Sequence, residues 1–362
     1  MVMRILIMAG GTGGHVFPAL AVAETLRGRG AEVVWLGTRR GLEARVAPAA
    51  GFDVDWLRVA GLRGKGAVTW LLAPLSVAVA VGQAVAVMLH RRPMVVLGMG
   101  GYATGPGGVA AWLLRIPLLI HEQNAIAGLT NRLLSRLATR VLAAFPGAFP
   151  QRRRALLVGN PVRAALTALP VPEERMRNRG GALRVLVIGG SLGERDLNEL
   201  MPRALQRLAP ERRPVVRHQT GERHLEDARR AYEAAGVSAE SIVPFIDDMA
   251  AAYAWADLVV SRAGALTVAE LAATGVGAVL VPYPHAADEH QTANARYLAD
   301  NGAAILISQE RLTPEGLADL LDGFTAAGQR RRLIDMATAA RRLARPDAAE
   351  RIASVCMEAA HA

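Results

Sequence analysis

Short, mainly apolar runs alternate with helix-like segments along the chain. Runs at Ile5–Met8, Glu32–Leu36, Met94–Leu97 and Leu118–Ile120 have the length and composition of buried strands. A helix is expected from about Pro18 to Gly28. Short strands that alternate with helices are typical of parallel βαβ units. The first half of the chain is therefore predicted to form a doubly wound parallel sheet.

The same pattern restarts in the second half. Runs at Arg184–Ile188, Asp257–Ser261 and Gly277–Pro282 predict further strands. The segment Ala168–Gly181 carries prolines and a cluster of charges, which favours a domain boundary at or just before it. The pattern as a whole predicts an α/β protein with two Rossmann-like, doubly wound parallel-sheet domains that face a central cleft.

The length of 362 residues also favours two domains, because single hydrophobic cores stop growing at about 250–300 residues. The first domain is expected over residues 1–163 and the second over residues 164–343. A C-terminal helix at about 344–362 is expected to pack back on the first domain.

Glycine-rich turns follow strands in both halves, at Gly10–His15, within Gly98–Gly108 and at Gly189–Gly193. Such turns let backbone N–H groups approach a phosphate without interference from side chains. Ligands of doubly wound sheets lie outside the carboxyl ends of the strands, so the turns are expected to point to one cleft. His15 closes the first turn and places a titratable group beside a phosphorylated ligand. This suggests chemistry on a nucleotide-linked substrate, although a satisfied loop histidine is the alternative.

Composition narrows the classes of function. The net charge of +10 predicts an acidic partner, which could be phosphates, nucleic acid or an anionic membrane. Aromatic residues make up only 4% of the chain, which leaves few stacking platforms and disfavours a nucleic-acid binder. The single lysine, Lys65, lies outside any Walker-type loop, and the single cysteine, Cys356, excludes an intramolecular disulfide. The first residues carry no signal-peptide pattern.

An uncharged apolar stretch covers Ala67–Leu89. It is long enough to span a bilayer, but Pro74 and Gln83 weaken that interpretation. A buried core helix is a second interpretation. The third, which we favour, is a helix that docks on a membrane surface, because basic residues flank an apolar surface and attract anionic lipid. The flanking residues are Arg63 and Lys65 before the stretch and Arg91 and Arg92 after it.

Two further patterns have ordinary explanations. Arg132, Arg136 and Arg140 recur every four residues, which predicts a basic stripe on one helical face, most simply a solvated face. Asp53-Val54-Asp55 resembles the acidic pair of metal-dependent sugar transferases, but two acids spaced by one are common. No set of residues has metal-ligand spacing, so no metal or other cofactor is expected.

Polar clusters follow several of the predicted strands. Asn124 offers an amide, and Asn160–Arg163 offers a guanidinium near the domain join. Ser191 lies in the third glycine turn and could bind a ligand or cap a helix. Ser261–Glu270 reads as a strand end, a turn and a helix start, where the helix N-terminus suits a diphosphate. Glu270 sits about one turn into that helix and can accept hydrogen bonds from a ribose diol, or simply complement the helix dipole. A further polar loop runs from His285 to Gln291.

Taken together, these motifs resemble the MurG family, the N-acetylglucosaminyltransferases of bacterial cell-wall synthesis, over essentially the whole chain. The matching segments are Met8–Pro18, Gly61–Gly66, Gly98–Tyr102, His121–Asn124, Gly159–Arg163, Phe245–Met249 and Gly264–Glu270. The resemblance implies a GT-B glycosyltransferase of family 28. It also implies an inverting reaction without a metal, UDP-N-acetylglucosamine (UDP-GlcNAc) as the donor and the second domain as the donor-binding one.

The resemblance assigns roles to particular residues. His15 is the expected general base, since a neutral imidazole suits proton removal near pH 7. Arg163 is the first candidate for stabilising the leaving diphosphate and Arg262 the second. The expected substrate-binding residues are Thr12, Gly13, Gly14, Asn124, Arg163, Ser191, Ile246 at the uracil, Ala265, Leu266, Thr267, Val268, Ala269, Glu270 at the ribose, and Gln291. The chain has Leu192-Gly193-Glu194 where the family often has Gln-Gly-Ala.

The implied reaction transfers N-acetylglucosamine to the C4 hydroxyl of the MurNAc in undecaprenyl-pyrophosphoryl-MurNAc-pentapeptide (lipid I), which gives lipid II and UDP. The implied location is peripheral, on the cytoplasmic face of the bacterial inner membrane. There the first domain would bind the lipid-linked acceptor and the anionic membrane surface, with further cell-wall synthesis proteins as partners.

Two enzyme classes remain as rivals. A UDP-N-acetylglucosamine 2-epimerase would share this architecture but would need neither a membrane nor a second sugar. A dinucleotide-dependent oxidoreductase would need an acid about twenty residues after the first glycine turn, and Glu32 is available there. However, the first turn lacks the G-x-G-x-x-G spacing, and the turn at Gly189 would be unexplained.

Overall fold

The structure is a computed structural model that describes residues 2–58, 73–189, 194–283, 289–325 and 329–361. Contacts divide the chain into two units. Unit 1 comprises Met1–Val162 and Pro346–Ala362, and unit 2 comprises Arg163–Arg345. The Gly61–Gly66 segment, which includes Lys65, and Ser191 with its neighbours Leu192 and Gly193 lie outside the described residues.

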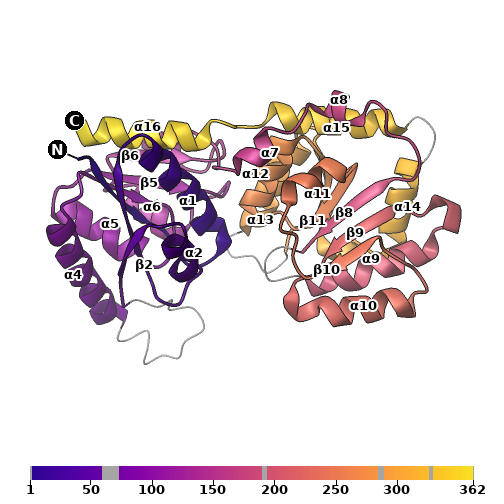
Figure 1. The fold of residues 1–362 in the computed structure, drawn as a ribbon, viewed down its shortest axis with the longest axis horizontal. Helices are drawn as coiled ribbons and strands as arrows, with labels where there is room; N and C mark the ends of the chain where they lie inside the picture. The colour runs from indigo at the N-terminus through magenta and orange to yellow at the C-terminus, as the bar shows by residue number, and fades with distance from the viewer. Residues whose placement is uncertain (1, 59–72, 190–193, 284–288, 326–328, 362) are drawn as a thin grey trace. The chain divides into compact units, whose positions relative to one another are not determined.

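Unit 1 contains a seven-stranded parallel sheet with the order β3-β2-β1-β4-β5-β6-β7 (Figure 1). Its strands are β1 (Arg4–Met8), β2 (Glu32–Gly37), β3 (Asp53–Trp56), β4 (Val95–Gly98), β5 (Leu118–Glu122), β6 (Arg140–Ala143) and β7 (Leu156–Leu157). The order reverses between β1 and β4, so the helices that follow these two strands pack on opposite faces of the sheet. This point of reversal is where doubly wound sheets bind ligands.

Helices cover both faces of the unit 1 sheet. They are α1 (Gly13–Gly28), α2 (Glu43–Ala49), α4 (Ala73–Arg91), α5 (Thr104–Leu113), α6 (Leu129–Leu134) and α16 (Ala348–His361), with a 3-10 turn η1 (Gln151–Arg153). The C-terminal helix α16 lies with unit 1 (Figure 1), where Ile352 and Cys356 join the same buried cluster as Val16 of α1. Helices α4, α5 and α6 contribute Met88, Ala110 and other residues to the cluster on the opposite face.

Unit 2 contains a six-stranded parallel sheet with the order β10-β9-β8-β11-β12-β13, which repeats the order of the first six strands of unit 1. Its strands are β8 (Arg184–Ile188), β9 (Val215–Gln219), β10 (Ser241–Val243), β11 (Leu258–Ser261), β12 (Gly277–Leu280) and β13 (Ala304–Leu306). The predicted fold class, two Rossmann-like parallel-sheet domains, is therefore confirmed.

Helices pack on the sheet of unit 2, where one apolar cluster includes Val185, Val260 and Leu321. Leu186, Val259 and Leu280 of the strands are also fully buried. The helices are α7 (Ala164–Thr167), α8 (Pro172–Met176), α9 (Arg195–Arg207), α10 (Leu225–Ala234), α11 (Met249–Trp255), α12 (Ala265–Thr274), α13 (His290–Ala299), α14 (Pro314–Thr325) and α15 (Gln329–Arg342). Short 3-10 turns are η2 (Pro210–Arg212), η3 (Glu222–His224) and η5 (Gln309–Arg311).

Two local predictions were wrong. Helix α1 begins at Gly13 rather than near Pro18, because the carbonyl of Thr12 already accepts hydrogen bonds from the amides of His15 and Val16. The basic helical stripe does not exist, because α6 ends at Leu134 and Arg140 opens strand β6. The three arginines therefore lie partly in a helix and partly in a strand, so their spacing of four residues does not place them on one helical face.

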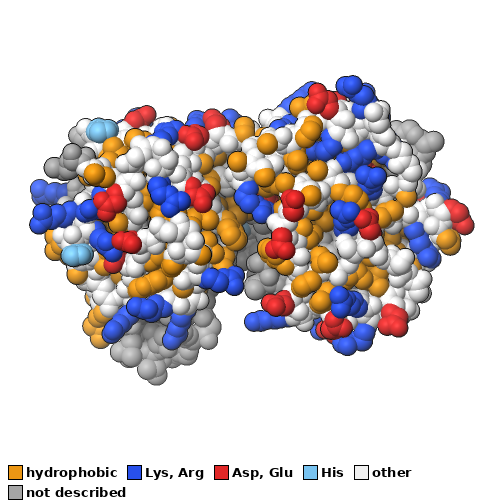
Figure 2. All heavy atoms as spheres, viewed as in Figure 1, with side chains coloured by type: hydrophobic (Ala, Val, Ile, Leu, Met, Phe, Trp, Pro, Cys, Tyr) orange, Lys and Arg blue, Asp and Glu red, His pale blue; other side chains and the backbone are white. Residues whose placement is uncertain are grey.

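Helix α4 holds the described part of the apolar stretch. The segment Pro74–Arg91 is long and apolar enough to cross a membrane by length and composition, and only 17% of it is buried. The core-helix interpretation is therefore wrong. Ala80, Ala84 and Met88 form the buried stripe, and much of the remaining apolar surface faces outward. Figure 2 shows that Lys and Arg side chains are spread over the visible surface of both units rather than gathered in one patch.

Candidate active site

The first glycine turn connects β1 to α1 at the switch point of unit 1. Gly11 has a φ of +91°, a left-handed conformation that favours glycine. The amide of Gly10 donates to the carbonyl of Gly100, 3.2 Å away, in the loop after β4. Any other residue at position 101 would place its β-carbon 2.4 Å from the backbone oxygen of Gly10. Only glycine therefore permits this approach of the two loops.

Thr12 is the N-cap of α1, and Gly13, Gly14 and His15 form the first turn of the helix. The imidazole of His15 packs on the backbone of Gly100, where a β-carbon would lie 2.8 Å from Nε2. Burial lowers the pKa of His15, although the negative charge of Glu122, the backbone of Gly10 and the charge of Glu43 raise it in part. The imidazole is therefore neutral at pH 7 and can accept a proton.

Glu122 at the end of β5 organises the segment that carries Asn124. Its Oε1 accepts hydrogen bonds from the backbone amide and the side-chain amide of Asn124, at 3.0 and 3.1 Å. Its Oε2 accepts from the amide of Gly128 and from Nδ2 of Asn131, at 3.1 and 2.9 Å. The carboxylate thus fixes the turn between β5 and α6.

The same segment is tied to its neighbours in unit 1. Gln123 donates to the carbonyl of Met99, 2.8 Å away, and Asn160 donates to the carbonyl of Gln123, 2.9 Å away. His121 is fully buried, its Nε2 lies 2.9 Å from the oxygen of Gly159, and burial lowers its pKa to about 4. The predicted polar segments after β4, β5 and β7 therefore form one connected network.

In unit 2, Gly264 is the N-cap of α12, so the backbone amides of Ala265, Leu266 and Thr267 form the helix N-terminus. Val268 and Ala269 complete that turn, and Glu270 follows within the helix. Helix N-termini bind anions through backbone amides and the helix dipole. The structure therefore places the predicted 265–270 segment where a diphosphate can bind.

The carboxylate of Glu270 has two partners. The hydroxyl of Tyr253 donates to Oε2 at 3.1 Å, and Nη2 of Arg163 lies 3.6 Å from Oε1. Burial raises the pKa of Glu270, while Arg163 and the bond from Tyr253 lower it. The Arg163 side chain is 53% exposed, so its guanidinium can reach a ligand as well as Glu270.

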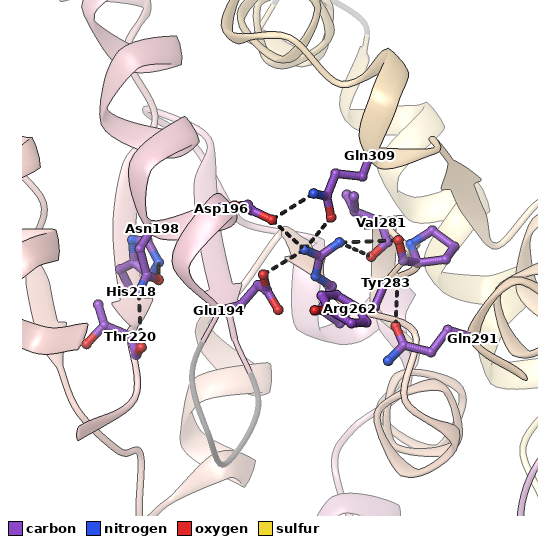
Figure 3. A network of polar contacts seen from close by, with 11 residues as sticks. Glu194, Asp196, Asn198, His218, Thr220, Arg262, Val281, Tyr283, Gln291 and Gln309 are labelled. Carbon is purple, nitrogen blue, oxygen red and sulfur yellow. Dashed lines mark hydrogen bonds and ion pairs between the residues drawn. The ribbon is translucent and has the colours of Figure 1, made fainter. Parts of the chain in front are cut away.

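Arg262 follows β11 and is bound tightly within unit 2 (Figure 3). Its Nη2 lies 2.7 Å from both Glu194 Oε1 and Gln309 Oε1, and its Nη1 donates to the carbonyls of Val281 and Pro282. Only 8% of the side chain is exposed. Arg262 thus has a structural role in this conformation. Its counter-ion is Glu194, a position at which the family often has alanine.

Three further residues of unit 2 were predicted to bind the donor, namely Gln291, Ile246 and Ser191. Gln291 begins α13 with His290 and accepts a hydrogen bond from the amide of Tyr283 at 2.9 Å (Figure 3). Ile246 is partly exposed between β10 and α11. Ser191 lies outside the described residues.

Comparison with known proteins decides the family. Models of the glycosyltransferase family 28 N-terminal and C-terminal domains match residues 5–143 and 184–352. A protein from Alkalilimnicola ehrlichii is 59% identical over 360 residues, covering 99% of this chain and 100% of that protein. A relative from Nitrosococcus oceani is 56% identical, covering 99% of each chain. Both are named UDP-N-acetylglucosamine–N-acetylmuramyl-(pentapeptide) pyrophosphoryl-undecaprenol N-acetylglucosamine transferase.

Solved structures agree with this result. The crystal structure of MurG from Acinetobacter baumannii has a TM-score of 0.85 at 40% identity, and the match covers 98% of this chain and 99% of that one. The chain belongs to the MurG family. A UDP-GlcNAc 2-epimerase from Neisseria meningitidis has a TM-score of 0.68 at 12% identity, a likeness that shows the fold alone.

The structure also bears on two alternatives to the MurG family. Glu32 lies at the amino end of β2, where it pairs with Arg4 at 2.7 Å, whereas a ribose-binding acid belongs at the carboxyl end. Glu32 therefore cannot serve a dinucleotide in the way that the oxidoreductase alternative requires. Asp53 and Asp55 of β3 bind Arg91 at 3.3 and 2.8 Å, so the acidic pair has a structural partner.

Three residues that hold the predicted segments in place escaped the sequence analysis, namely Glu43, Glu122 as an organising carboxylate, and Tyr253. Glu122 stood inside a recognised motif, but its partners could not be read from the motif. Glu43 and Tyr253 gave no signal in the sequence, because Glu43 contacts Gly11 across 32 residues and Tyr253 contacts Glu270 across 17.

Proposed function

We propose that this glycosyltransferase moves N-acetylglucosamine from UDP-GlcNAc to the C4 hydroxyl of MurNAc in undecaprenyl-pyrophosphoryl-MurNAc-pentapeptide, releasing UDP and lipid II for peptidoglycan synthesis. The observation that carries this proposal is 59% identity, over the full length of both chains, to a transferase named for this donor and acceptor. The geometry of each unit fits the roles that the reaction requires.

Unit 2 supplies the donor site in this proposal. The ribose hydroxyls of UDP-GlcNAc donate to Glu270, whose carboxylate is held by Tyr253. The diphosphate binds at the N-terminus of α12. Of the two arginines considered for the leaving group, Arg163 fits better, because its side chain is exposed while Arg262 is already paired with Glu194 and Gln309.

Unit 1 supplies the base. The C4 hydroxyl attacks the anomeric carbon in a single displacement with inversion, the bond from that carbon to the diphosphate oxygen breaks, and His15 accepts the hydroxyl proton. A positioned base of this kind contributes roughly 10²–10⁴-fold to the rate. The neutral state of His15, which burial favours, leaves the imidazole free to accept the proton.

We further propose that the layer of α4, α5 and α6 docks on the anionic cytoplasmic leaflet, as a peripheral contact. Large apolar side chains of this layer are exposed: Leu75, Val77, Val79 and Leu89 of α4, Trp112 and Leu113 of α5, and Leu129 and Leu133 of α6. Arg92, Arg115 and Arg136 are exposed near the ends of these helices. Apolar area beside basic charge is the pattern of an interfacial surface, and it would keep the enzyme near its lipid-linked acceptor.

One assay tests the reaction. Radiolabelled UDP-GlcNAc is incubated with the enzyme, with and without a lipid-linked MurNAc-pentapeptide acceptor. We expect label to enter the lipid only when acceptor is present, with equimolar release of UDP. Conversion of UDP-GlcNAc in the absence of acceptor, without label in the lipid fraction, would instead support the epimerase.

A further inference from the structure

Glu43, the first residue of α2, is a fully buried carboxylate outside the residues assigned above. Its Oε2 accepts a hydrogen bond from the amide of Gly11 at 2.9 Å. Its Oε1 accepts from the amide and the hydroxyl of Thr38, at 2.9 and 2.7 Å. All three donors are uncharged. Burying a carboxylate is costly unless its hydrogen bonds are satisfied, and here three donors satisfy them.

Glycines make room for the carboxylate. A β-carbon at Gly10 would lie 2.5 Å from Oε1 of Glu43, and one at Gly37 would lie 2.7 Å from its Cγ. A β-carbon at Gly41 would also overlap the carboxylate. The backbones after β1, at the end of β2 and before α2 therefore all pack directly on Glu43.

The start of α2 holds Gly11 at both of its polar groups. Glu43 accepts a hydrogen bond from the amide of Gly11, and the amide of Leu42 donates to the carbonyl of Gly11 at 3.1 Å. On the other side of the turn, Gly10 donates to Gly100, whose backbone supports the ring of His15. The turn that leads into His15 is thus clamped between α2 and the loop after β4.

We propose that Glu43 is a positioning residue for glycosyl transfer: by fixing Gly11, it sets the direction in which the first turn of α1 presents His15 to the acceptor hydroxyl. This inference rests on the proposed function of His15 as the base. Catalytic groups must be held within a fraction of an ångström of the productive geometry. A carboxylate locked by three hydrogen bonds gives the flexible glycine turn that rigidity.

The informative variant is Glu43→Gln. It keeps the volume and one acceptor oxygen for Thr38, but it turns an N–H₂ donor toward the amide of Gly11 and removes the charge. We expect kcat to fall at least 10-fold, while the affinity for UDP, a ligand of unit 2, changes less than 2-fold. Glu24→Gln is the matched control, because Glu24 is exposed on α1, and it should keep kcat within 2-fold of the wild type.

A second readout is independent of transfer activity. The titratable groups that face His15 are Glu122 and His121 of β5 and Glu43 of α2. Because the charge of Glu43 raises the pKa of His15, Glu43→Gln should lower that pKa when it is measured by NMR of the labelled imidazole. It should also speed amide hydrogen exchange in residues 10–15. Both changes would be seen even if the wild-type enzyme failed to transfer the sugar to the lipid-linked acceptor, which separates this inference from the proposed function.

Two results would overturn the proposal. The first is a folded Glu43→Gln enzyme with kcat within 3-fold of the wild type. The second is unchanged hydrogen exchange in the turn. If Glu43→Gln does not fold, Glu43→Asp replaces it, because aspartate keeps the charge but withdraws the carboxylate from Gly11. A folded Glu43→Asp protein with a 5-fold or greater loss of kcat and unchanged UDP affinity supports the proposal, and wild-type kcat refutes it.

Discussion

The hydroxyl of Tyr253 on α11 donates a 3.1 Å hydrogen bond to Oε2 of Glu270 on α12. Burial and the neighbouring charge of Glu270 raise the pKa of Tyr253 well above its ordinary value. The hydroxyl therefore stays protonated and always acts as the donor. One carboxylate oxygen is thereby fixed, which holds Glu270 in place for the ribose contact proposed above.

Replacing Tyr253 by phenylalanine should weaken UDP binding. The loss of one hydrogen bond to a charged group is worth about 1.5–3 kcal/mol, so we expect the Kd for UDP to rise roughly 10- to 150-fold in calorimetry. With 2′,3′-dideoxy-UDP the variant and the wild type should bind alike. Tyr232→Phe, which removes another buried hydroxyl of unit 2 that lies 3.0 Å from His218, is the control. An equal loss for both nucleotides would contradict a role through Glu270.

The pH dependence of kcat should reflect His15. A base must be neutral, and burial lowers the pKa of His15 below its ordinary 6.5. The acid limb of the profile should therefore have its midpoint below pH 6.5, and His15→Ala should reduce kcat roughly 10²–10⁴-fold while UDP still binds. Stopped assays across pH 5–9 measure the limb. A midpoint above pH 7, or near-normal turnover of a folded His15→Ala enzyme, would exclude His15 as the base.

Arg262 should matter mainly for the stability of unit 2. Lysine cannot reproduce its fork of bonds to Glu194, Gln309 and the carbonyls of Val281 and Pro282. Lysine keeps the charge but leaves some of these buried acceptors without a donor, so we expect Arg262→Lys to lower the free energy of unfolding by about 2–4 kcal/mol.

Urea unfolding provides the measurement for Arg262, and Arg331→Lys provides its control. Arg331 is 82% exposed and pairs with Asp335, so that change should alter the free energy of unfolding by less than about 0.5 kcal/mol. If Arg262→Lys leaves stability unchanged but weakens UDP binding more than 10-fold, Arg262 acts on the diphosphate instead.

Vesicle binding should depend on the exposed face of α4. Leu75 and Val79 are 65% and 51% exposed, and burying such side chains contributes about 1.5–3 kcal/mol each. The double change Leu75→Ser and Val79→Ser should therefore cut flotation with anionic vesicles at least 10-fold. Val171→Ser with Val215→Ser, two exposed positions of unit 2, should leave flotation unchanged. Wild-type protein that fails to float at low salt would refute the docking surface.

Stability should fall in mild acid because two histidines are buried in the neutral form. Burial lowers the pKa of His121 to about 4 and of His218 to about 3. Nδ1 of His218 lies 3.0 Å from the hydroxyl of Tyr232. Its Nε2 lies 2.9 Å from Oδ1 of Asn198 (Figure 3). In the unfolded chain both protonate near pH 6.5, so their stabilisation is complete above that pH and is lost as the pH falls toward the folded values.

Each histidine should then cost about 1.4 kcal/mol per pH unit below pH 6.5. Urea unfolding at pH 7.5 and pH 5.0 measures the difference in the free energy of unfolding. Equal stability at the two values would mean that neither imidazole has a lowered pKa in the folded protein.

The repeat of strand, glycine turn and helix could be predicted, because the signals are local. The apolar residues Ile5–Met8 are enough by themselves to indicate a buried strand. Gly11 adopts a left-handed conformation, which glycine adopts readily. Local signals failed where two elements met. The spacing of Arg132, Arg136 and Arg140 suggested one helix, but the chain turns from α6 into β6 between them.

Sequence alone determined the two parallel sheets, the position of the glycine turns at strand ends and the family, because periodicity and motifs act over short stretches of chain. Only the tertiary structure decided which partner each polar side chain has. Glu43 meets Gly11 across 32 residues and Arg262 meets Glu194 across 68. Such pairs arise because packing the sheet brings strand ends together, and no local pattern encodes the free energy of that packing.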